Sequence, residues 1–421
     1  MKQIKLGDYI DILTDYHSGG SYKTLKEKTK ILYEPNYAVM IRTLNFENDD
    51  FTNDLIYCDK SSYDFLAYSH VHENDILMNK IANPGSVYIM PKVEYKTTCG
   101  MNLFLIRLKN ISQRYMYYVM KYNESYIKSQ THGTTTKTIT KDEVRDLVFY
   151  IHETREEQNR VEQLLSTIDS KISNNKKIIN ALNNITKLIY DYWFVQFDFP
   201  DENGKPYKSS GGKMVWNEEL KREIPDGWEV KHIDDLISQL SGFPFSSNDY
   251  VNSGNYKLYT IKNVQDGFID DKVDNTIDSI PHNMDKGCIL SVGDMIMSLT
   301  GNVGRVGIVY EKNALLNQRV LKLIPKVSSK MFIYQFIRSD EIQYRISQIA
   351  VGTSQKNLSP IELGSLLVIK PNEKIIDKYK NACEKMYERI TGFMQENQEL
   401  ASLRDFLLPM LMNGQVKIKE H

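Results

Sequence analysis

Two short polar loops carry the side chains best suited to bind another molecule. Each loop opens with a glycine, contains hydroxyl groups, ends with a lysine and precedes an expected helix start, at Thr140 or Ser359. Free N–H groups at a helix start, with nearby hydroxyls and a lysine, suit a phosphate, and an amide could read a base edge. The alternative is a solvated loop beside a helix cap. The candidate DNA-binding residues are Thr134, Thr135, Thr136, Lys137, Thr353, Ser354, Gln355 and Lys356.

A third candidate is Arg305, at the end of the run Gly301-Asn-Val-Gly-Arg305. This run predicts a tight turn first and a contact to the DNA backbone second. Lys262 and Asn263 follow an expected strand and are weaker candidates of the same kind.

Signatures of catalysis are absent from the sequence. It contains no phosphate-binding G-x-x-x-x-G-K-[ST], no H-E-x-x-H, no G-x-S-x-G and no calcium loop. Ala82-Asn-Pro-Gly85 lacks the second proline and the aromatic residue of the Asn-Pro-Pro-aromatic loop of adenine methyltransferases, so we predict a turn. His70 and His72 lack a clustered third ligand, which favours a surface loop over a metal site.

Composition narrows the class of protein further. Apolar residues make up 41% and charged residues 25%, as in ordinary globular proteins, and the net charge of -1 means that any basic surface is local. The four cysteines form no C-x-x-C pair, so we expect reduced thiols in a cytoplasmic protein. No signal-peptide core and no run of 18 apolar residues occurs, so no membrane partner is expected.

The longest regular pattern runs from about residue 153 to 197. Apolar residues alternate at steps of four and three over about five heptads, which predicts a coiled-coil helix of roughly 50 Å. Asn175 and Thr186 are the polar positions in this seam. The apolar positions are Val161, Leu165, Ile168, Ile172, Ile179, Leu182, Ile189 and Trp193.

The chain then repeats itself. DILMNKIANPGSV from Asp75 matches DMIMSLTGNVGRV from Asp294, and GTTTKTI from Gly133 matches GTSQKNL from Gly352, both 219 residues on. Ile41-Arg-Thr matches Ile261-Lys-Asn at an interval of 220. Thr140 with Glu143, and Ser359 with Glu362, have the spacing of capping boxes. We infer an internal duplication of a domain and a helix.

The second helix is expected over about 373–413. Its intervening domain lets it return along the first helix, so antiparallel pairing is expected, with Asn175 and Asn397 fixing the register. Alternatively, Gly392 and Arg404 mark a weaker, broken helix. The seam positions of this helix are Tyr379, Cys383, Met386, Ile390, Phe393, Asn397, Leu400, Leu407 and Leu411.

These patterns predict an α+β protein with two tandem α/β domains, alternating with two long helices that pair as an antiparallel coiled coil with a pseudo-twofold repeat. In the first domain we expect strands at 38–44, 75–81, 86–90, 103–108 and 147–151 and a helix at 112–127. The expected boundaries are 1–152 for the first domain, 153–197 for the first helix, 198–226 for a linker, 227–371 for the second domain and 372–421 for the second helix.

The sequence resembles the specificity subunit of type I restriction–modification systems over nearly its whole length. The match lies in the duplication, the paired G-T-[ST]-x-K-x-[IL] loops and several runs in order. These runs are EEQNRVEQLLSTIDSKI, YDYWF, VQFD, EELKREIPDGWEV, LTGNVGR with LNQ at 316–318, and LLPMLMNG. The first domain departs from the pattern because it lacks a clear counterpart of Leu316-Asn317-Gln318 and has Met101-Asn102 nearby instead.

The resemblance implies a function. Each domain would be a target recognition domain that reads half of a bipartite target in double-stranded DNA, and the helices would set the gap. The chain would be non-catalytic and bind no cofactor. Two modification subunits would dock on the helices and methylate adenine with S-adenosylmethionine, and restriction subunits would use ATP and Mg²⁺ to translocate and cleave DNA.

Two alternatives remain open from the sequence. One is a specificity subunit of another restriction class, with a fused methyltransferase–nuclease partner. The other is a coiled-coil scaffold with two protein-binding domains and no role on DNA.

Overall fold

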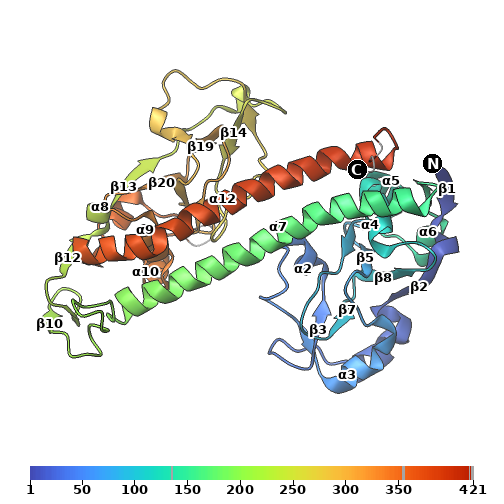
Figure 1. The fold of residues 1–421 in the computed structure, drawn as a ribbon, viewed down its shortest axis with the longest axis horizontal. Coiled ribbons are helices and arrows are strands. Elements are labelled where there is room, and N and C mark those ends of the chain that lie inside the picture. The colour runs from blue at the N-terminus through green and yellow to red at the C-terminus, as the bar shows by residue number, and fades with distance from the viewer. Residues whose placement is uncertain (134–135, 353–355, 417, 419–421) are drawn as a thin grey trace. The chain divides into compact units, whose positions relative to one another are not determined.

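The computed structural model describes residues 1–133, 136–352, 356–416 and 418. The chain forms two compact units, one of residues 1–170 with 400–421 and one of residues 171–399. Each unit contains one globular domain and a part of both long helices (Figure 1).

The first domain is built from three small sheets. β1 pairs antiparallel with β9; a four-stranded antiparallel sheet has the order β2-β8-β5-β6; a third sheet has the order β4-β3-β7, in which β3 and β7 are parallel. The bounds are β1 Lys2–Lys5, β2 Ile10–Asp15, β3 Ala38–Ile41, β4 Tyr57–Cys58, β5 Ile76–Asn79, β6 Val87–Ile89, β7 Thr97–Cys99, β8 Leu103–Leu108 and β9 Val148–Ile151.

Helices cover one side of the four-stranded sheet. Ser112 caps α4 by accepting a hydrogen bond from the Tyr115 N–H, and α4 buries Tyr115, Met116 and Val119 in the same core as Ile76 and Ile106. The expected helix 112–127 is in fact two helices, α4 and α5. The bounds are α1 Tyr22–Lys28, α2 Thr43–Glu47, α3 Lys60–Phe65, α4 Gln113–Tyr122, α5 Glu124–Ser129 and α6 Lys141–Asp146.

The second domain repeats this plan. β12 pairs with β21, a four-stranded antiparallel sheet has the order β13-β20-β17-β18, and a sheet of order β15-β14-β19-β16 contains the parallel pair β14 and β19. The strands are β12 Glu229–His232, β13 Ile237–Ser241, β14 Tyr256–Tyr259, β15 Thr276–Ile277, β16 Ile289–Leu290, β17 Met295–Ser298, β18 Val306–Ile308, β19 Ala314–Leu316, β20 Val320–Pro325 and β21 Leu367–Lys370. The helices are α8 Ile233–Leu236, α9 Lys330–Arg338, α10 Asp340–Ile349 and α11 Pro360–Gly364.

Strand register supports the duplication and corrects one part of it. β3 meets β7 with Ile41 opposite Cys99, and β14 meets β19 with Tyr259 opposite Leu316. Ile41 therefore corresponds to Tyr259, and the match to Ile261 was wrong by two residues. The sequence match between Ile41-Arg-Thr and Ile261-Lys-Asn rested on one shared apolar residue, and a single apolar residue does not define the alignment of two strands.

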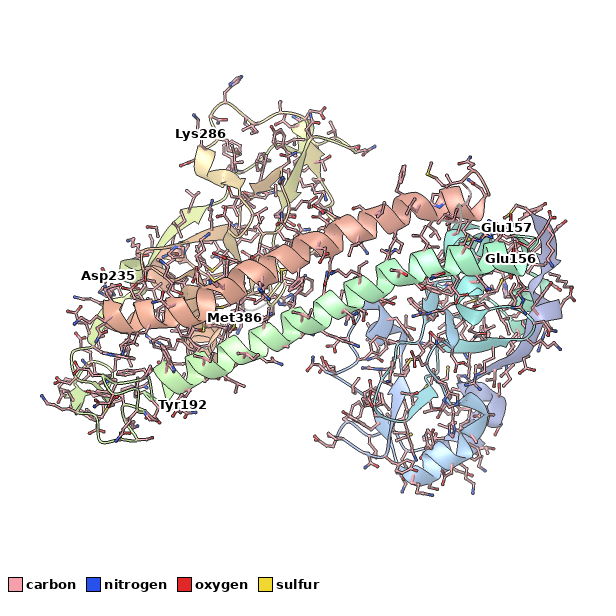
Figure 2. The ribbon with its side chains drawn as sticks, in the orientation of Figure 1. Glu156, Glu157, Tyr192, Asp235, Lys286 and Met386 are labelled. Atoms are coloured by element: carbon pink, nitrogen blue, oxygen red, sulfur yellow. The ribbon has the colours of Figure 1, made fainter. Side chains whose placement is uncertain are left out.

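The two long helices are continuous. α7 spans Arg155–Tyr190 and continues as a π-helical turn, Asp191–Val195, whereas α12 spans Glu373–Met412 and runs unbroken through Gly392 and Arg404. Figure 2 labels Glu156 and Glu157 at the first turn of α7 and Tyr192 at its end. Acidic residues at a helix start stabilise the helix because their negative charge lies near the positive end of the helix dipole.

In the first unit the start of α7 lies beside the end of α12 (Figure 1). Leu165 and Leu411 share a core, and the Arg404 guanidinium lies 3.0 Å from the Asp169 carboxylate, which also accepts a 2.6 Å bond from the Tyr118 hydroxyl. Burial lowers the pKa of Arg404, but the adjacent Asp169 more than offsets this and raises it. This pair joins both helices to the first domain.

In the second unit the end of α7 pairs with the start of α12. The buried Asn175 donates a 2.9 Å bond to the side-chain oxygen of Asn397, so the expected polar pair is confirmed. The Tyr379 hydroxyl donates to the Thr186 carbonyl oxygen at 3.1 Å. Since Asn175 meets Asn397 and Thr186 meets Tyr379, numbers rise along α7 as they fall along α12, and the pair is antiparallel.

The expected seam positions differ in how far they are covered. Val161, Leu165, Ile168, Ile179 and Ile390 are buried. Also buried are Tyr379, Cys383, Leu411 and the polar Asn175 and Thr186. The half-buried positions are Ile172, Leu182, Ile189, Trp193, Met386, Phe393, Asn397, Leu400 and Leu407.

The segment 198–226 is more than the expected linker. It contains a hairpin of β10 (Met214–Asn217) and β11 (Arg222–Pro225), and Phe199 stacks between Tyr207 and Trp228 at ring-centroid distances of 4.6 and 5.0 Å. Its glycines, prolines and serines resemble a flexible segment, but these aromatic rings have enough apolar area to anchor it in the second unit.

One capping box is confirmed and the other was wrong. Thr140 and Glu143 cap α6 reciprocally, as expected. Ser359 stands at the cap of α11, but its side chain makes no capping bond. Pro360 occupies the first turn with a preset φ, so this short helix starts without the hydroxyl.

Candidate nucleic-acid interface

In the first domain, the segments that follow β3, β5 and β7 meet at one edge. β3 and β7 are parallel and end together, where the Gly100 N–H donates to the Ile41 carbonyl oxygen at 2.8 Å. The chain after Gly100 then meets the end of β5, because the Lys80 N–H donates to the Asn102 carbonyl oxygen at 2.9 Å. Backbone hydrogen bonds therefore hold these segments together.

The glycine-threonine loop joins the same edge. Two backbone bonds between His132 and Thr138, of 3.0 and 2.8 Å, close it as a hairpin. The Ala82 N–H donates to the Lys137 carbonyl oxygen at 3.2 Å, which links the loop to the turn after β5. We name residues 42–45, 80–85, 100–102, 132–133 and 136–139 the first loop edge.

The second domain repeats these bonds. The Asn317 backbone N–H donates to the Tyr259 carbonyl oxygen at 3.1 Å, and the Leu299 backbone N–H donates to the Arg319 carbonyl oxygen at 2.9 Å. Gly301 donates to the Lys356 carbonyl at 3.0 Å. Val351 and Asn357 close the second hairpin with bonds of 3.0 and 2.8 Å. We name residues 260–263, 299–304, 317–319, 351–352 and 356–358 the second loop edge.

These bonds reveal a correspondence that sequence comparison missed. Gly100 bonds as Asn317 does, and Asn102 bonds as Arg319 does, so Met101 is the counterpart of Gln318. The first domain therefore has a counterpart of Leu316-Asn317-Gln318, namely Cys99-Gly100-Met101. The side chains differ at every position, and the only signal in the sequence was the place of each run between two apolar strands.

Four of the predicted DNA-binding residues lie in the part of the chain that the structure describes. Thr136, Lys137 and Lys356 are exposed on the loop edges, whereas Arg305 is half-buried beside the turn and donates a 2.6 Å bond to the Gln265 side-chain oxygen. The others lie outside the described residues: Thr134, Thr135, Thr353, Ser354 and Gln355.

The two predicted turns are present. Gly85 and Gly304 have φ of +87° and +84°, a region that favours glycine, and a Cβ on Gly85 would lie 2.9 Å from the Ile127 side chain. Ala82 and Gly301 hold equivalent places with φ of +68° and +76°. The Asn-Pro-Gly run is thus a turn that packs on α5.

A charged cluster marks the first loop edge. Asp15, at the end of β2, is 6% exposed and forms ion pairs with Lys80 and with Lys141, the latter at 3.0 Å. Burial would raise the pKa of Asp15, but hydrogen bonds from Lys80, Ser18 and Lys141 outweigh it and hold the pKa at about 2. Two lysines on one carboxylate leave the cluster positive.

The second loop edge has no such cluster at the equivalent described positions. Asp15 lies opposite Phe104 in its sheet, and Ser241 lies opposite Leu321. Leu299 stands in place of Lys80, and Pro360 follows Ser359 where Lys141 follows Thr140.

The histidines and cysteines have structural surroundings. His70 stacks on Tyr63 at a centroid distance of 3.7 Å and is half-buried rather than on an open loop. All four cysteines are free and buried, and burial raises the pKa of Cys99 to about 12. Within the described residues, His, Cys, Asp and Glu nowhere gather in a group of three that could hold a metal ion. No helix among these residues is both long and apolar enough to cross a membrane.

Comparison with known proteins identifies the family. Residues 1–184 and 225–379 match the model of the type I restriction modification DNA specificity domain. The type I restriction enzyme MjaIX specificity subunit of Methanocaldococcus jannaschii is 25% identical over 75% of this chain and 72% of its own length. The HindI specificity subunit of Haemophilus influenzae is 22% identical over 96% of this chain and 99% of its own.

A solved structure has a similar fold. The crystal structure of the type I restriction–modification system S subunit from M. genitalium has a TM-score of 0.55 and 15% sequence identity, and the match covers 98% of this chain and 96% of that one. Since the family model matches most of the sequence, the chain belongs to the type I restriction–modification DNA specificity family.

Proposed function

We propose that this chain is a non-catalytic DNA-recognition subunit in which each loop edge reads one half of a bipartite duplex target. The observation that carries this is the repeated loop edge: the same backbone bonds present two sets of exposed side chains, each with a lysine, Lys137 or Lys356, at the same place. Lysines on a fixed loop suit phosphates, and neighbouring side chains can then reach base edges.

The exposed faces of the two long helices support the binding of two copies of one partner. Leu188 on α7 is 68% exposed and Phe406 on α12 is 63% exposed, and Ile185 and Leu403 are exposed beside them at the same spacing. Each pair forms an apolar face, one in each unit, and such exposed faces mark interaction sites. Two equal faces fit two modification subunits, which would methylate adenine with S-adenosylmethionine.

The continuous helices also fit the role of a spacer. α7 has 36 residues and α12 has 40, and a 36-residue helix is about 54 Å long. Inserting seven residues after Asn183, with a matched insertion in α12, should lengthen the gap between half-sites and leave both half-sites unchanged. A gap of unchanged length would contradict the spacer role.

Restriction subunits that use ATP and Mg²⁺ would complete the complex, which would act in the cytoplasm. The test compares the purified chain with its complex with modification subunits, on duplex DNA and S-adenosylmethionine. The chain alone should transfer no methyl groups, whereas the complex should methylate adenine and bind duplex with an affinity that falls as salt rises. Methylation by the chain alone, or a complex that does not bind duplex DNA, would overturn the proposal.

A further inference from the structure

The two loop edges hold some exposed side chains in common and exchange others. Lys137 matches Lys356, and Asn83 matches Asn302; all four are exposed. At four other exposed positions the chemistry changes between the domains. These pairs are Leu44 with Lys262, Met101 with Gln318, Asn102 with Arg319, and His132 with Val351.

The pairing of Leu44 with Lys262 follows from the segments that contain them, α2 in the first domain and a turn in the second. The side-chain oxygen of Asn45 accepts a 2.8 Å bond from the Arg42 N–H, and that of Asn263 accepts a 2.9 Å bond from the Thr260 N–H. Each asparagine is buried and holds the first turn after a parallel strand. The residue before each asparagine is therefore Leu44 in one domain and Lys262 in the other.

The two domains would bind two half-sites that have the same sugar-phosphate backbone and different bases. Side chains that both domains share are therefore suited to contact the backbone, and side chains that differ between the domains are suited to contact the bases. Building on the proposed function, we propose that the exchanged positions determine sequence specificity. Leu44 and Met101 read thymine methyl groups in one half-site, and Gln318 and Arg319 read purine edges in the other.

Exposure supports the role of the apolar pair. Leu44 in the short helix α2 is 51% exposed, and Met101 in the turn after β7 is 42% exposed, although backbone hydrogen bonds hold both segments. Their segments leave neighbouring parallel strands at one edge, where Gly100 bonds to Ile41. Apolar side chains at a DNA-reading edge contact the C5-methyl group of thymine, which only thymine presents in the major groove.

The counterpart positions in the second domain offer hydrogen-bonding groups instead. The Arg319 guanidinium lies 3.4 Å from the side-chain oxygen of Asn357, which also accepts a 2.9 Å bond from the Thr300 hydroxyl. Gln318 is exposed next to it. Arginine pairs with the O6 and N7 atoms of guanine, and glutamine pairs with the N6 and N7 atoms of adenine.

The test uses the complex of the full chain with modification subunits and the duplex target that methylome sequencing defines. Each thymine of the first half-site is replaced by uracil, which lacks only the methyl group. One or more replacements should weaken binding about fourfold per methyl, the factor that corresponds to about 0.8 kcal/mol. Leu44→Ala with Met101→Ala should abolish this difference between thymine and uracil.

The second arm replaces purines of the other half-site with their 7-deaza forms, which lack the N7 acceptor. Binding should fall about 2- to 13-fold at one or more positions, because N7 takes part in one of the two hydrogen bonds of a bidentate base contact and half of the contact's free energy is lost. Arg319→Ala or Gln318→Ala should remove the effect at one position. Lys60→Ala, on the exposed Lys60–Asp64 pair of α3, is the control and should preserve both patterns.

The outcomes separate this proposal from the proposed function. A complex that binds its target but shows no uracil effect in the first half-site, or keeps that effect in the double alanine variant, overturns the assignment of Leu44 and Met101. Unchanged binding to 7-deaza purines overturns the assignment of Gln318 and Arg319. Failure of the unmodified complex to bind the duplex instead overturns the proposed function.

Discussion

The two loop edges share a backbone and differ in their side chains. The bonds at Gly100 and Asn102 recur at Asn317 and Arg319, yet Lys80 and Lys141 on Asp15 in the first domain give way to Leu299 and Pro360 in the second. The helices show the opposite pattern, because the exposed pair Ile185 and Leu188 recurs as Leu403 and Phe406. On the proposed function, surfaces that bind a common partner would stay alike, whereas surfaces that read two different half-sites would diverge.

The largest expected effect tests the likeness of the helical faces. Leu188→Asp and Phe406→Asp should each reduce the bound modification subunits from two to one, since a charge on an apolar face must be desolvated on docking. The double variant should bind none. Sedimentation or native mass spectrometry of the complex measures this ratio.

Asn180→Asp is the matched control for that charge. It is an exposed residue of α7 that lies about 12 Å along the helix axis from Leu188, at about 1.5 Å per residue. At about 100° per residue it is about 80° around the helix from Leu188 and about 140° from Ile185, and it should leave two subunits bound. Loss of both subunits with Leu188→Asp alone would mean that the two faces are not independent.

An intermediate effect tests the difference between the loop edges. Asp15→Asn should destabilise the first domain by about 2 kcal/mol at neutral pH, because the pKa of Asp15 is about 2 in the folded chain against an ordinary 3.8. A folded-state pKa below the unfolded value adds stability above the unfolded pKa. The difference between variant and wild type should therefore shrink as the pH falls from about 4 towards 2.

Thermal unfolding across pH measures this difference. The control is Asp64→Asn, whose carboxylate forms an exposed ion pair with Lys60 at 2.8 Å and should change the melting temperature little. Ser241→Asp adds a carboxylate at the equivalent place without lysine partners and should not stabilise the second domain. A pH-independent effect of Asp15→Asn would show that the ion pairs do not carry it.

The smallest expected effect tests what the loop edges share. The slope of log affinity against log salt concentration is negative. Lys137→Ala and Lys356→Ala should each make it less steep by about 0.9, the value for one phosphate contact on duplex DNA. The two variants should behave alike and leave the methylated sequence unchanged. A changed recognition sequence would mean that these lysines read bases.

Local sequence patterns predicted the helices and turns because each depends on neighbouring residues. Heptad spacing located α7 and α12, and Asn175 and Asn397 stood out as polar residues in an apolar seam. The glycines at 85 and 304 marked turns that need positive φ. Each of these signals consists of residues that are close together in the sequence.

Most of the features that were not predicted depend on contacts between distant residues. The ion pair of Asp15 with Lys80 joins positions 65 residues apart, and no local pattern marks it. Met101 could be matched to Gln318 only through the bonds of the flanking backbone. Ser359 fits the capping spacing, but the adjacent Pro360 starts the helix without it. The hairpin at 214–225 was hidden by the polar residues around its buried aromatic anchors.

The central claim is that each domain reads its own half of the target. Methylome sequencing of cells that carry this chain, and of cells in which residues 1–152 are replaced by another recognition domain, tests it most directly. The account predicts a bipartite adenine-methylated motif in which the exchange alters one half and preserves both the other half and the gap. A change in both halves, or in neither, would contradict it.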